Sequence, residues 1–386
     1  MSKRIVIVML SSVAMFNVQA AEWSLTGGVN PSLKYDDNIF MRDTDKLGDY
    51  HASMSPTLEA GYETDKVETS LNTGFVMDRY HSSSQLDNDN PFVKLNTAYK
   101  TQRTTWDLGL GYVERSSRKD AADDTGDFET NSTLTRKSIS PSFSYQLTER
   151  DSLSLSTSYS EETYSTNDFN DIKKQTISTD WQHQLTERLK GGIRLSFNNN
   201  KSTGLFTETD DETYRLLLTS AYNVSEVWTI NGSAGLRQVD IQQTDFLGGT
   251  TETTDTSPSF VFDILYQTDI NQVSLSLSRT VSPSSTGDVN EQDKISIGWS
   301  RSLSETLSAS INASFQKTSS ALNTGNDDRE NISFSPALNW EYSPDSSLSL
   351  SYNYRQQNES FNNTEAISNA IMLTLKYDWH GINISR

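Results

Sequence analysis

The chain contains no cysteine and only four histidines, and these absences bear on whole classes of function. Without cysteine there are no disulfide staples and no thiol nucleophile. The histidines, His51, His81, His183 and His380, are scattered, and no Gly-x-Ser-x-Gly element is present to supply a serine nucleophile. No Asp-x-Asp-x-Asp-Gly spacing suggests a calcium loop. We therefore expect no enzymatic activity, no catalytic residues, no metal site and no cofactor.

Positive charge is scarce as well. Lys and Arg total 32 against 51 Asp and Glu, a formal net charge of −19. Two of the cations, Lys3 and Arg4, lie in a segment that we expect to be removed, so the mature chain is more acidic still. A chain of this charge is a poor partner for nucleic acid, and we expect none.

Long apolar runs are missing except at the N-terminus. Residues 5–16 are apolar, follow two basic residues and precede Val18-Gln19-Ala20, which resembles a signal-peptidase site. The run is shorter than the roughly 20 residues that a membrane-spanning helix needs. We expect a signal peptide at 1–20 and one domain at 21–386. The low mean hydropathy does not exclude a membrane, because a barrel wall presents only every second residue to lipid.

The dominant positive feature is an alternation with a period of two. Large residues occupy Ile139, Pro141, Phe143, Tyr145 and Leu147, and small polar residues lie between them. The same alternation resumes at Leu153 after the short connection 148–151, which predicts a β-hairpin. Similar short turns recur along the chain at 64–66, 101–103, 185–188, 225–227, 268–270, 303–306 and 343–345.

These hairpins predict an all-β protein, a transmembrane antiparallel up-and-down β-barrel of about 18 strands, with 16 as the alternative. An aqueous lumen is expected at that size. The expected strands are 23–38, 48–63, 67–80, 91–100, 104–115, 132–147, 152–160, 172–185, 189–198, 213–224, 228–238, 256–267, 271–281, 292–303, 307–316, 330–342, 346–355 and 369–379.

Two residue types recur at fixed places in the expected strands. Proline repeats in one phase, at Pro31 and in four Ser-Pro elements, and this predicts either a local bulge or a widened strand pair. Aromatic residues precede the short turns, as in an interfacial ring, whereas the core of a soluble β-sandwich would not need them there. These aromatic residues are Tyr62, Tyr99, Tyr145, Trp181, Tyr222, Tyr266, Trp299 and Tyr342.

The acidic excess is concentrated in the long connections. We expect these residues to face outward, as solvated loop residues or as sharers of divalent cations with anionic lipid head groups. They include Asp120, Asp123, Asp124, Asp127, Glu129, Glu208, Asp210, Asp211, Glu212, Asp327 and Asp328.

The inward strand positions carry mostly small polar residues, which would not fill the lumen. Basic residues exceed acidic ones slightly at these positions, so a weak anion preference is one expectation, and pairing that only braces the wall is the other. The residues expected to line the pore are Lys34, Arg136, Lys190, Arg194, Arg215, Arg237 and Lys376, and weaker candidates are Lys94, Lys100, Lys174, Lys294 and Arg355.

The first expected strand ends in Tyr35-Asp36-Asp37-Asn38-Ile39-Phe40. This hexapeptide and the Ser-Pro elements at 55–56, 140–141, 257–258 and 335–336 resemble the beta-barrel porin 2 family. The resemblance implies an outer-membrane pore for secretion of an exopolysaccharide, with both termini in the periplasm. It also implies contact with outer-membrane lipids and lipopolysaccharide, a transported polysaccharide chain and a periplasmic polysaccharide-export protein.

Two alternatives to export remain open: a general or solute-specific diffusion porin, and a structural or adhesive barrel with a plugged lumen. The role of the hexapeptide is also open. Its Asp36-Asp37-Asn38 segment could cap the passage from strand to loop, or it could bind a cation.

Overall fold

The computed structural model describes residues 21–321, 328–360 and 363–385. Its 18 strands have these bounds: β1 (Glu22–Asp36), β2 (Asp49–Glu63), β3 (Val67–Tyr80), β4 (Asn88–Lys100), β5 (Thr104–Ser116), β6 (Thr133–Gln146), β7 (Asp151–Tyr164), β8 (Asp171–Gln184), β9 (Leu189–Thr203), β10 (Thr207–Asn223), β11 (Trp228–Asp245), β12 (Thr250–Gln267), β13 (Asn271–Pro283), β14 (Val289–Ser302), β15 (Leu307–Ser320), β16 (Arg329–Ser343), β17 (Ser346–Glu359) and β18 (Thr364–Ser385). Two single-turn 3₁₀ helices, η1 (Ser84–Leu86) and η2 (Ser117–Lys119), lie in connections.

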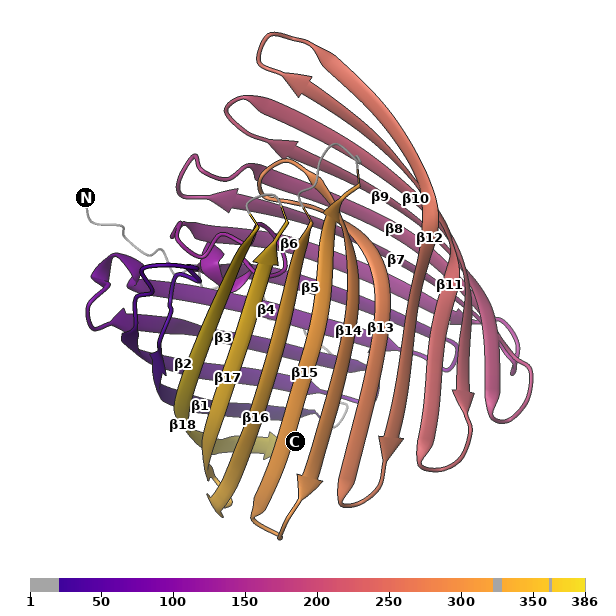
Figure 1. Ribbon diagram of the computed structural model, residues 1–386. Helices are drawn as coiled ribbons and strands as arrows, with labels where there is room; N and C mark the ends of the chain where they lie inside the picture. Colours follow the sequence, from indigo (N-terminus) through magenta and orange to yellow (C-terminus); the bar gives the residue numbers. More distant parts are fainter. Residues whose placement is uncertain (1–20, 322–327, 361–362, 386) are drawn as a thin grey trace, which may run out of the picture.

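The strands form one closed sheet (Figure 1). Each strand pairs antiparallel with its neighbours in the chain, and β1 also pairs with β18, from Glu22↔Ser385 to Asp36↔Ala370. The expectation of an all-β, up-and-down barrel of 18 strands is confirmed. Among the described residues, no helix is long and apolar enough to cross a membrane. The expected signal peptide, 1–20, lies outside the described residues.

Side chains alternate between the two faces of the wall, as the period of two requires. Ile139 and Leu110 are paired across β5 and β6, and both are exposed on the outer face. Ser142 lies in the opposite phase and donates a hydrogen bond to Asp107 on the inner face. The outer wall is therefore apolar and the inner wall polar, the reverse of a soluble protein.

Aromatic ring pairs lie near the long connections, as Tyr35 does with Tyr50, and also near the short turns. Ring pairs there include Trp23 with Tyr62, whose centroids lie 4.6 Å apart, and Trp228 with Tyr266 at 4.9 Å. We call this end of the barrel the short-turn end and the opposite end the long-connection end. The two described chain ends meet at the short-turn end, where Glu22 and Ser385 lie beside the β2–β3 turn.

The recurrent prolines widen strand pairs and do not create bulges. Across β6 and β7 the pairing runs through Ile139↔Tyr159, skips Pro141 and its neighbour, and resumes at Ser142↔Ser156 in the same register. The same two-residue gap without a register shift occurs beside Pro31, Pro56 and Pro336. Proline lacks the N–H that the ladder needs, so one pair opens while the register survives.

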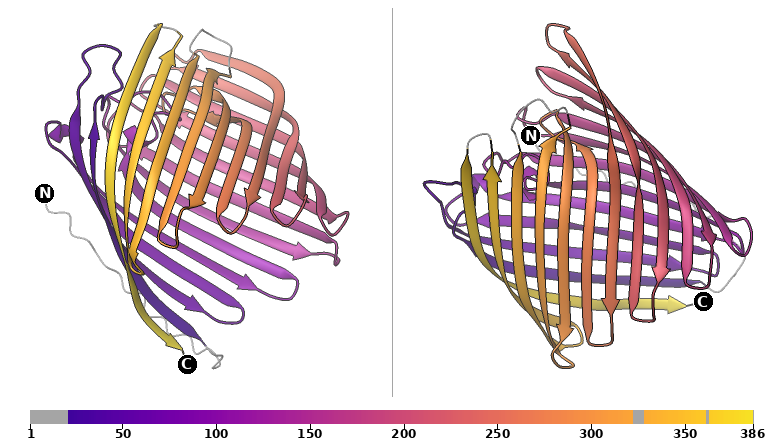
Figure 2. Two further views of the ribbon diagram at one scale, coloured as in Figure 1. Left: turned by 60° about the horizontal axis from the view of Figure 1, so that its bottom comes forward. Right: turned by 45° about the vertical axis from the view of Figure 1, so that its right-hand side comes forward.

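Pro258 is different, because pairing does not resume beyond it. Strand β12 has 18 residues, but it pairs with β13 only from Phe260↔Arg279 to Gln267↔Gln272. The remaining part of β12 continues upward with β9, β10 and β11, and these four strands rise beyond the rest of the barrel (Figures 1 and 2). The barrel therefore has a partly opened seam between β12 and β13 at the long-connection end.

Candidate functional site: the lumen and its mouth

All seven residues expected to line the pore lie in the strand phase that faces the lumen. For example, Arg194 lies between the outward-facing Ile193 and Leu195, and Arg215 lies between Tyr214 and Leu216. Five of the seven are held in ion pairs, and three of these pairs join different strands, as bracing of the wall requires. These pairs are Lys34–Asp36 at 3.1 Å, Arg194–Asp180 at 2.7 Å, Lys376–Asp378 at 2.6 Å, Arg136–Glu162 and Arg237–Glu291.

Two of the seven residues, Arg237 and Arg215, connect strands that are not neighbours in the sheet. Arg237 on β11 has a fully buried side chain and pairs with Glu291 on β14. Arg215 on β10 donates to the carbonyl of Val281 on β13, 3.4 Å away. Above them, toward the long-connection end, the buried Val239 and Ile241 of β11 pack against Val289 of β14. The inward side chains of β10 and β11 therefore contact the β13–β14 hairpin, although β12 and β13 are not paired at this level.

The long β5–β6 connection folds into the mouth of the barrel. Asp120 and Asp124 are partly buried there, which corrects the expectation that they face outward, whereas Asp123 and Glu129 are exposed. Ala121 and Phe128 are almost fully buried, and they form a cluster with Met41 of the β1–β2 connection and Ala366 on β18. The guanidinium of Arg355 on β17 lies 4.9 Å from the centre of the Phe128 ring. Burial of these apolar side chains draws the loop inward in spite of its charge.

The far wall of the barrel holds this loop by its backbone. Arg329 on β16 donates to the carbonyl of Asp124 at 2.6 Å, and Asn331 donates to the carbonyl of Ala122 at 3.0 Å. Gln357 on β17 donates to the carbonyl of Gly126 at 3.1 Å. Because the loop begins and ends at β5 and β6, these contacts show that it crosses the lumen.

A second element meets the loop from the side. The backbone N–H of Ser285, in the β13–β14 connection, donates to the Asp124 carboxylate at 3.0 Å. The carbonyl of Ser285 accepts from the N–H of Asn170 at 2.7 Å, and Thr209 donates to the carbonyl of Gly287 at 2.8 Å. The expectation that small residues leave the lumen unfilled therefore does not extend to the mouth, where two connections occupy part of it.

Burial also affects the charges in the loop. Desolvation raises the pKa of the Asp120 carboxyl, while the nearby positive charge of Arg115, 2.7 Å away in an ion pair, acts in the opposite direction. At the exposed rim, a hydrogen bond to Glu129 raises the pKa of Arg42. The loop therefore brings acidic residues into the mouth, where Arg115 and Arg42 neutralise part of their negative charge.

The hexapeptide at the end of β1 fastens the β1–β2 connection to β18. The hydroxyl of Ser368 donates to the Asp36 carboxylate at 2.6 Å, and the N–H of Asn369 donates to Asp37 at 2.7 Å. Asn38 donates to the carbonyl of Ile367 at 2.9 Å. These contacts make Asp36-Asp37-Asn38 a cap between strand and loop, and the part of the chain described by the structure holds no cluster of three or more His, Asp or Glu suited to a metal ion.

The apolar end of the hexapeptide lies against the same mouth. Tyr35 is on the outer face, stacked at an angle on Tyr50 with a centroid distance of 4.9 Å. Ile39 and Phe40 are buried with Leu86 of η1. The guanidinium of Arg118 lies 5.3 Å from the Phe40 ring centre, and it donates to the carbonyl of Ile39. The β1–β2 and β5–β6 connections therefore pack together as one unit.

A second group of acidic residues is also placed differently from the expectation. Glu208, Asp210, Asp211 and Glu212 belong to β10 and not to a connection. Asp211 faces inward, is almost fully buried and accepts a hydrogen bond from Asn200 at 2.8 Å. Asp327 lies outside the described residues, and Asp328 pairs with Lys317 at 2.6 Å.

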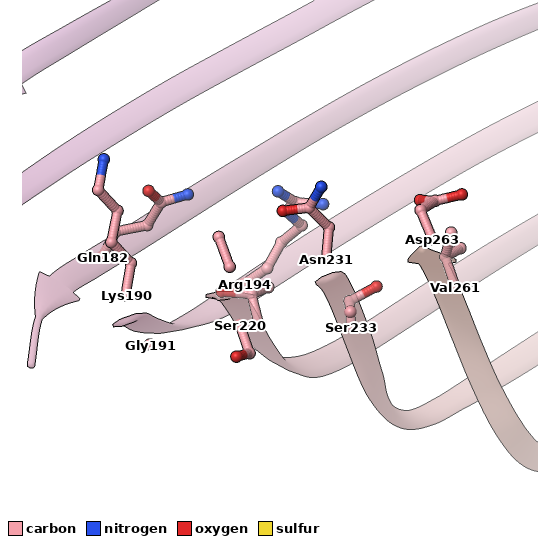
Figure 3. Close-up of a pocket in the computed structure, with 12 residues that line it drawn as sticks. Gln182, Lys190, Gly191, Arg194, Ser220, Asn231, Ser233, Val261 and Asp263 are labelled. Atoms are coloured by element: carbon pink, nitrogen blue, oxygen red, sulfur yellow. The ribbon is translucent and has the colours of Figure 1, made fainter. Parts of the chain in front are cut away.

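Below the mouth, the inner wall of β8 to β12 carries a polar cavity of about 290 Å³. Figure 3 shows Lys190, Arg194, Asn231 and Asp263 extending from the same side of the sheet, while Ser220 points away. Small residues, among them Ala221, line the cavity between the longer side chains. This cavity faces the lumen near the short-turn end.

Sequence reasoning did not identify the residues that hold the loop across the lumen: Arg118, Ser285, Arg329, Asn331 and Gln357. The signal available in the sequence was the length of the β5–β6 connection together with its apolar residues Ala121 and Phe128, because a purely solvated loop does not need apolar residues.

In sequence, no protein-family model and no curated protein matches this chain, so the resemblance to the beta-barrel porin 2 family is not confirmed. Among solved structures, OccAB3 of Acinetobacter baumannii is similar over 94% of this chain and 99% of its own, at 11% identity and a TM-score of 0.51. The alcaligin outer-membrane receptor FauA of Bordetella pertussis is similar over 92% and 76%, at 10% identity and a TM-score of 0.51.

The ferric citrate transporter FecA, in its unliganded form, is similar over 86% of this chain at 12% identity and a TM-score of 0.54. The chain spans 60% of the length of FecA. At these identities the likeness concerns the fold and not the activity. This chain has the fold of the outer-membrane β-barrels, with 18 antiparallel strands.

Proposed function

We propose that this protein is an outer-membrane channel for small polar solutes, and that the β5–β6 connection narrows the pathway at the long-connection end. The observation that carries the proposal is this loop, which is held across a polar lumen by Arg329, Asn331 and Gln357. A closed sheet of 18 strands encloses more space than its side chains fill, and an inward loop then sets the size of solute that passes.

The barrel lies in the outer membrane with its short-turn end in the periplasm, so both described chain ends are periplasmic. The apolar outer face contacts lipid and, in the outer leaflet, lipopolysaccharide. Diffusion of small solutes has better support than export of a polysaccharide chain, because a polymer would require the loop to leave the mouth. No finding supports a polysaccharide-export partner.

Charge on the wall favours weak selectivity. Five of the seven residues expected to line the pore are neutralised by a neighbouring carboxylate, and the other two, Lys190 and Arg215, form no ion pair within the described residues. We expect a mild preference for anions.

The test is conductance of the purified barrel in planar bilayers. We expect a small, stable conductance, which rises severalfold when residues 119–130 are replaced by Gly-Ser-Gly. The matched control replaces the β11–β12 connection, 246–249, by Asn-Gly; it lies at the tip of the rising strands, outside the mouth (Figure 1), and should leave conductance unchanged. Absence of conductance in both the wild-type barrel and the loop variant would favour a plugged scaffold.

A further inference from the structure

Four adjacent strands bring opposite charges to one level of the inner wall. Lys190 on β9 pairs in register with Ala221 on β10, Ala221 with Asn231 on β11, and Asn231 with Asp263 on β12. The next level upward holds Gly192, Thr219 and Ser233 in register. Small residues thus form the floor of the cavity, a cation stands at one side and a carboxylate at the other (Figure 3).

Several polar side chains of this cavity have no partner within the described part of the protein. Within the described residues, the side chains of Lys190, Asn231 and Asp263 form no ion pair and no hydrogen bond. Arg194 donates from Nε to Asp180 at 2.7 Å, and its terminal nitrogens have no partner in the described chain. Elsewhere on the inner wall, charges such as Lys376 and Asp378 are paired.

We propose that this cavity binds a small zwitterion of dipeptide size, with its carboxylate at Lys190 and Arg194 and its ammonium at Asp263. The proposal rests on the channel function and adds the class of solute. A guanidinium and an ammonium are the groups that best bind a carboxylate, and a carboxylate beside an amide oxygen binds an ammonium. Asn231 lies between the two ends, where its amide can bind a peptide group.

The spacing of the charges selects the length of the ligand. Lys190 and Asp263 are three strand spacings apart, about 14 Å along the wall, and their side chains cover part of that distance. An extended dipeptide spans about 7 Å between its ends. A single α-amino acid carries both charges on one carbon and cannot contact both sides at once.

The experiment measures binding to the detergent-solubilised full barrel by calorimetry, and block of single-channel current in bilayers. The probes are diglycine, glycine, N-acetyl-diglycine, which lacks the ammonium, and diglycine amide, which lacks the carboxylate. We expect diglycine to bind most tightly, and each of the other three to bind about tenfold more weakly or worse, because each loses one charge-assisted contact.

Two variants assign the ends. Lys190→Gln should remove the advantage of diglycine over its amide, and Asp263→Asn should remove its advantage over the N-acetyl form. Controls are Lys66→Gln, in the β2–β3 turn, and Asp107→Asn, on the inner face of β5; neither residue lines the cavity, and neither should change binding.

The outcomes separate this proposal from the channel function. Binding of diglycine to a barrel that does not conduct would uphold the site and overturn the channel. A conducting barrel that binds all four probes equally, or none of them, would overturn the site alone. Unchanged discrimination in both Lys190→Gln and Asp263→Asn would also overturn it.

Discussion

Ile139 and Ser140 are neighbours in the chain but lie on opposite faces of the wall. The side chain of Ile139 is 42% exposed on the outer face. Ser140 lies opposite Gly109 on the inner face. A residue's environment in this protein is set by its phase along the strand more than by its sequence neighbours.

We therefore expect Ile139→Arg to lower the free energy of unfolding by about 2–4 kcal/mol, because a charged side chain would enter the lipid layer. Ser140→Arg serves as the matched control, since its side chain would reach water in the lumen. Denaturant titration of the barrel in lipid vesicles measures both. Equal losses for the two variants would contradict the assigned faces.

Phe128 is the apolar anchor of the β5–β6 connection, packed with Met41 and Ala366 and covered by Arg355. Phe128→Ala should weaken the seating of the loop by about 3 kcal/mol, the range for truncating a buried aromatic ring. Trypsin cleavage after Arg118 or Lys119 should then become faster. Phe246→Ala, at an exposed strand connection, should leave the cleavage rate as in the wild type. Unchanged cleavage of Phe128→Ala would mean that Phe128 does not anchor the loop.

At the scale of elements, the β5–β6 connection and the β13–β14 connection act on each other through Asp124 and Ser285. Each is also tied to the wall, the first to β16 and β17 and the second to β10. The mouth is closed by contacts between elements far apart in the chain, and displacement of either connection must break the contact that the other provides.

The absence of cysteine makes this contact testable by a single engineered bridge. Asp124→Cys combined with Ser285→Cys should form a disulfide on oxidation and should suppress current fluctuations that come from loop movement. Reduction should restore them. Each single cysteine variant is the control and should not respond to oxidation. Failure of the pair to cross-link would contradict the contact between the two connections.

The strands could be predicted from the sequence because their period of two is local. The β3 boundaries agree in full, and β10 begins earlier than expected because Glu208, Asp210 and Glu212 suggest a loop by their charge. On β10 these three residues alternate with the inward-facing Thr209 and Asp211, in the part of the strand that rises beyond the rest of the barrel. The contact of Asp124 with Ser285 could not be predicted, because 161 residues separate the two and no local pattern encodes their meeting.

For the whole molecule, the two ends of the barrel differ, and this difference is the basis of the proposed orientation. The short turns and both described chain ends gather at one end, while the longer connections and the rising strands form the other (Figure 2). In outer-membrane barrels the short turns face the periplasm.

We expect Leu247→Cys, at a position that is 80% exposed in the β11–β12 connection, to react with a membrane-impermeant maleimide on intact cells. Glu149→Cys, in the short β6–β7 turn, should react only after the outer membrane is permeabilised. The two variants control for each other, since both positions lie in solvent-exposed turns. The reverse pattern of labelling would invert the barrel.

The cap at Asp36-Asp37-Asn38 also bears on the order in which contacts form during folding. Its partners, Ile367, Ser368 and Asn369, belong to β18, the described strand farthest from β1 along the chain, and β1 needs that same strand to complete its own pairing. Loop closure over so long a chain is the slowest contact to form. The N-terminal hexapeptide can therefore engage only in a barrel whose circle is finished, and its hydrogen bonds act as a latch that distinguishes a completed barrel from an open sheet.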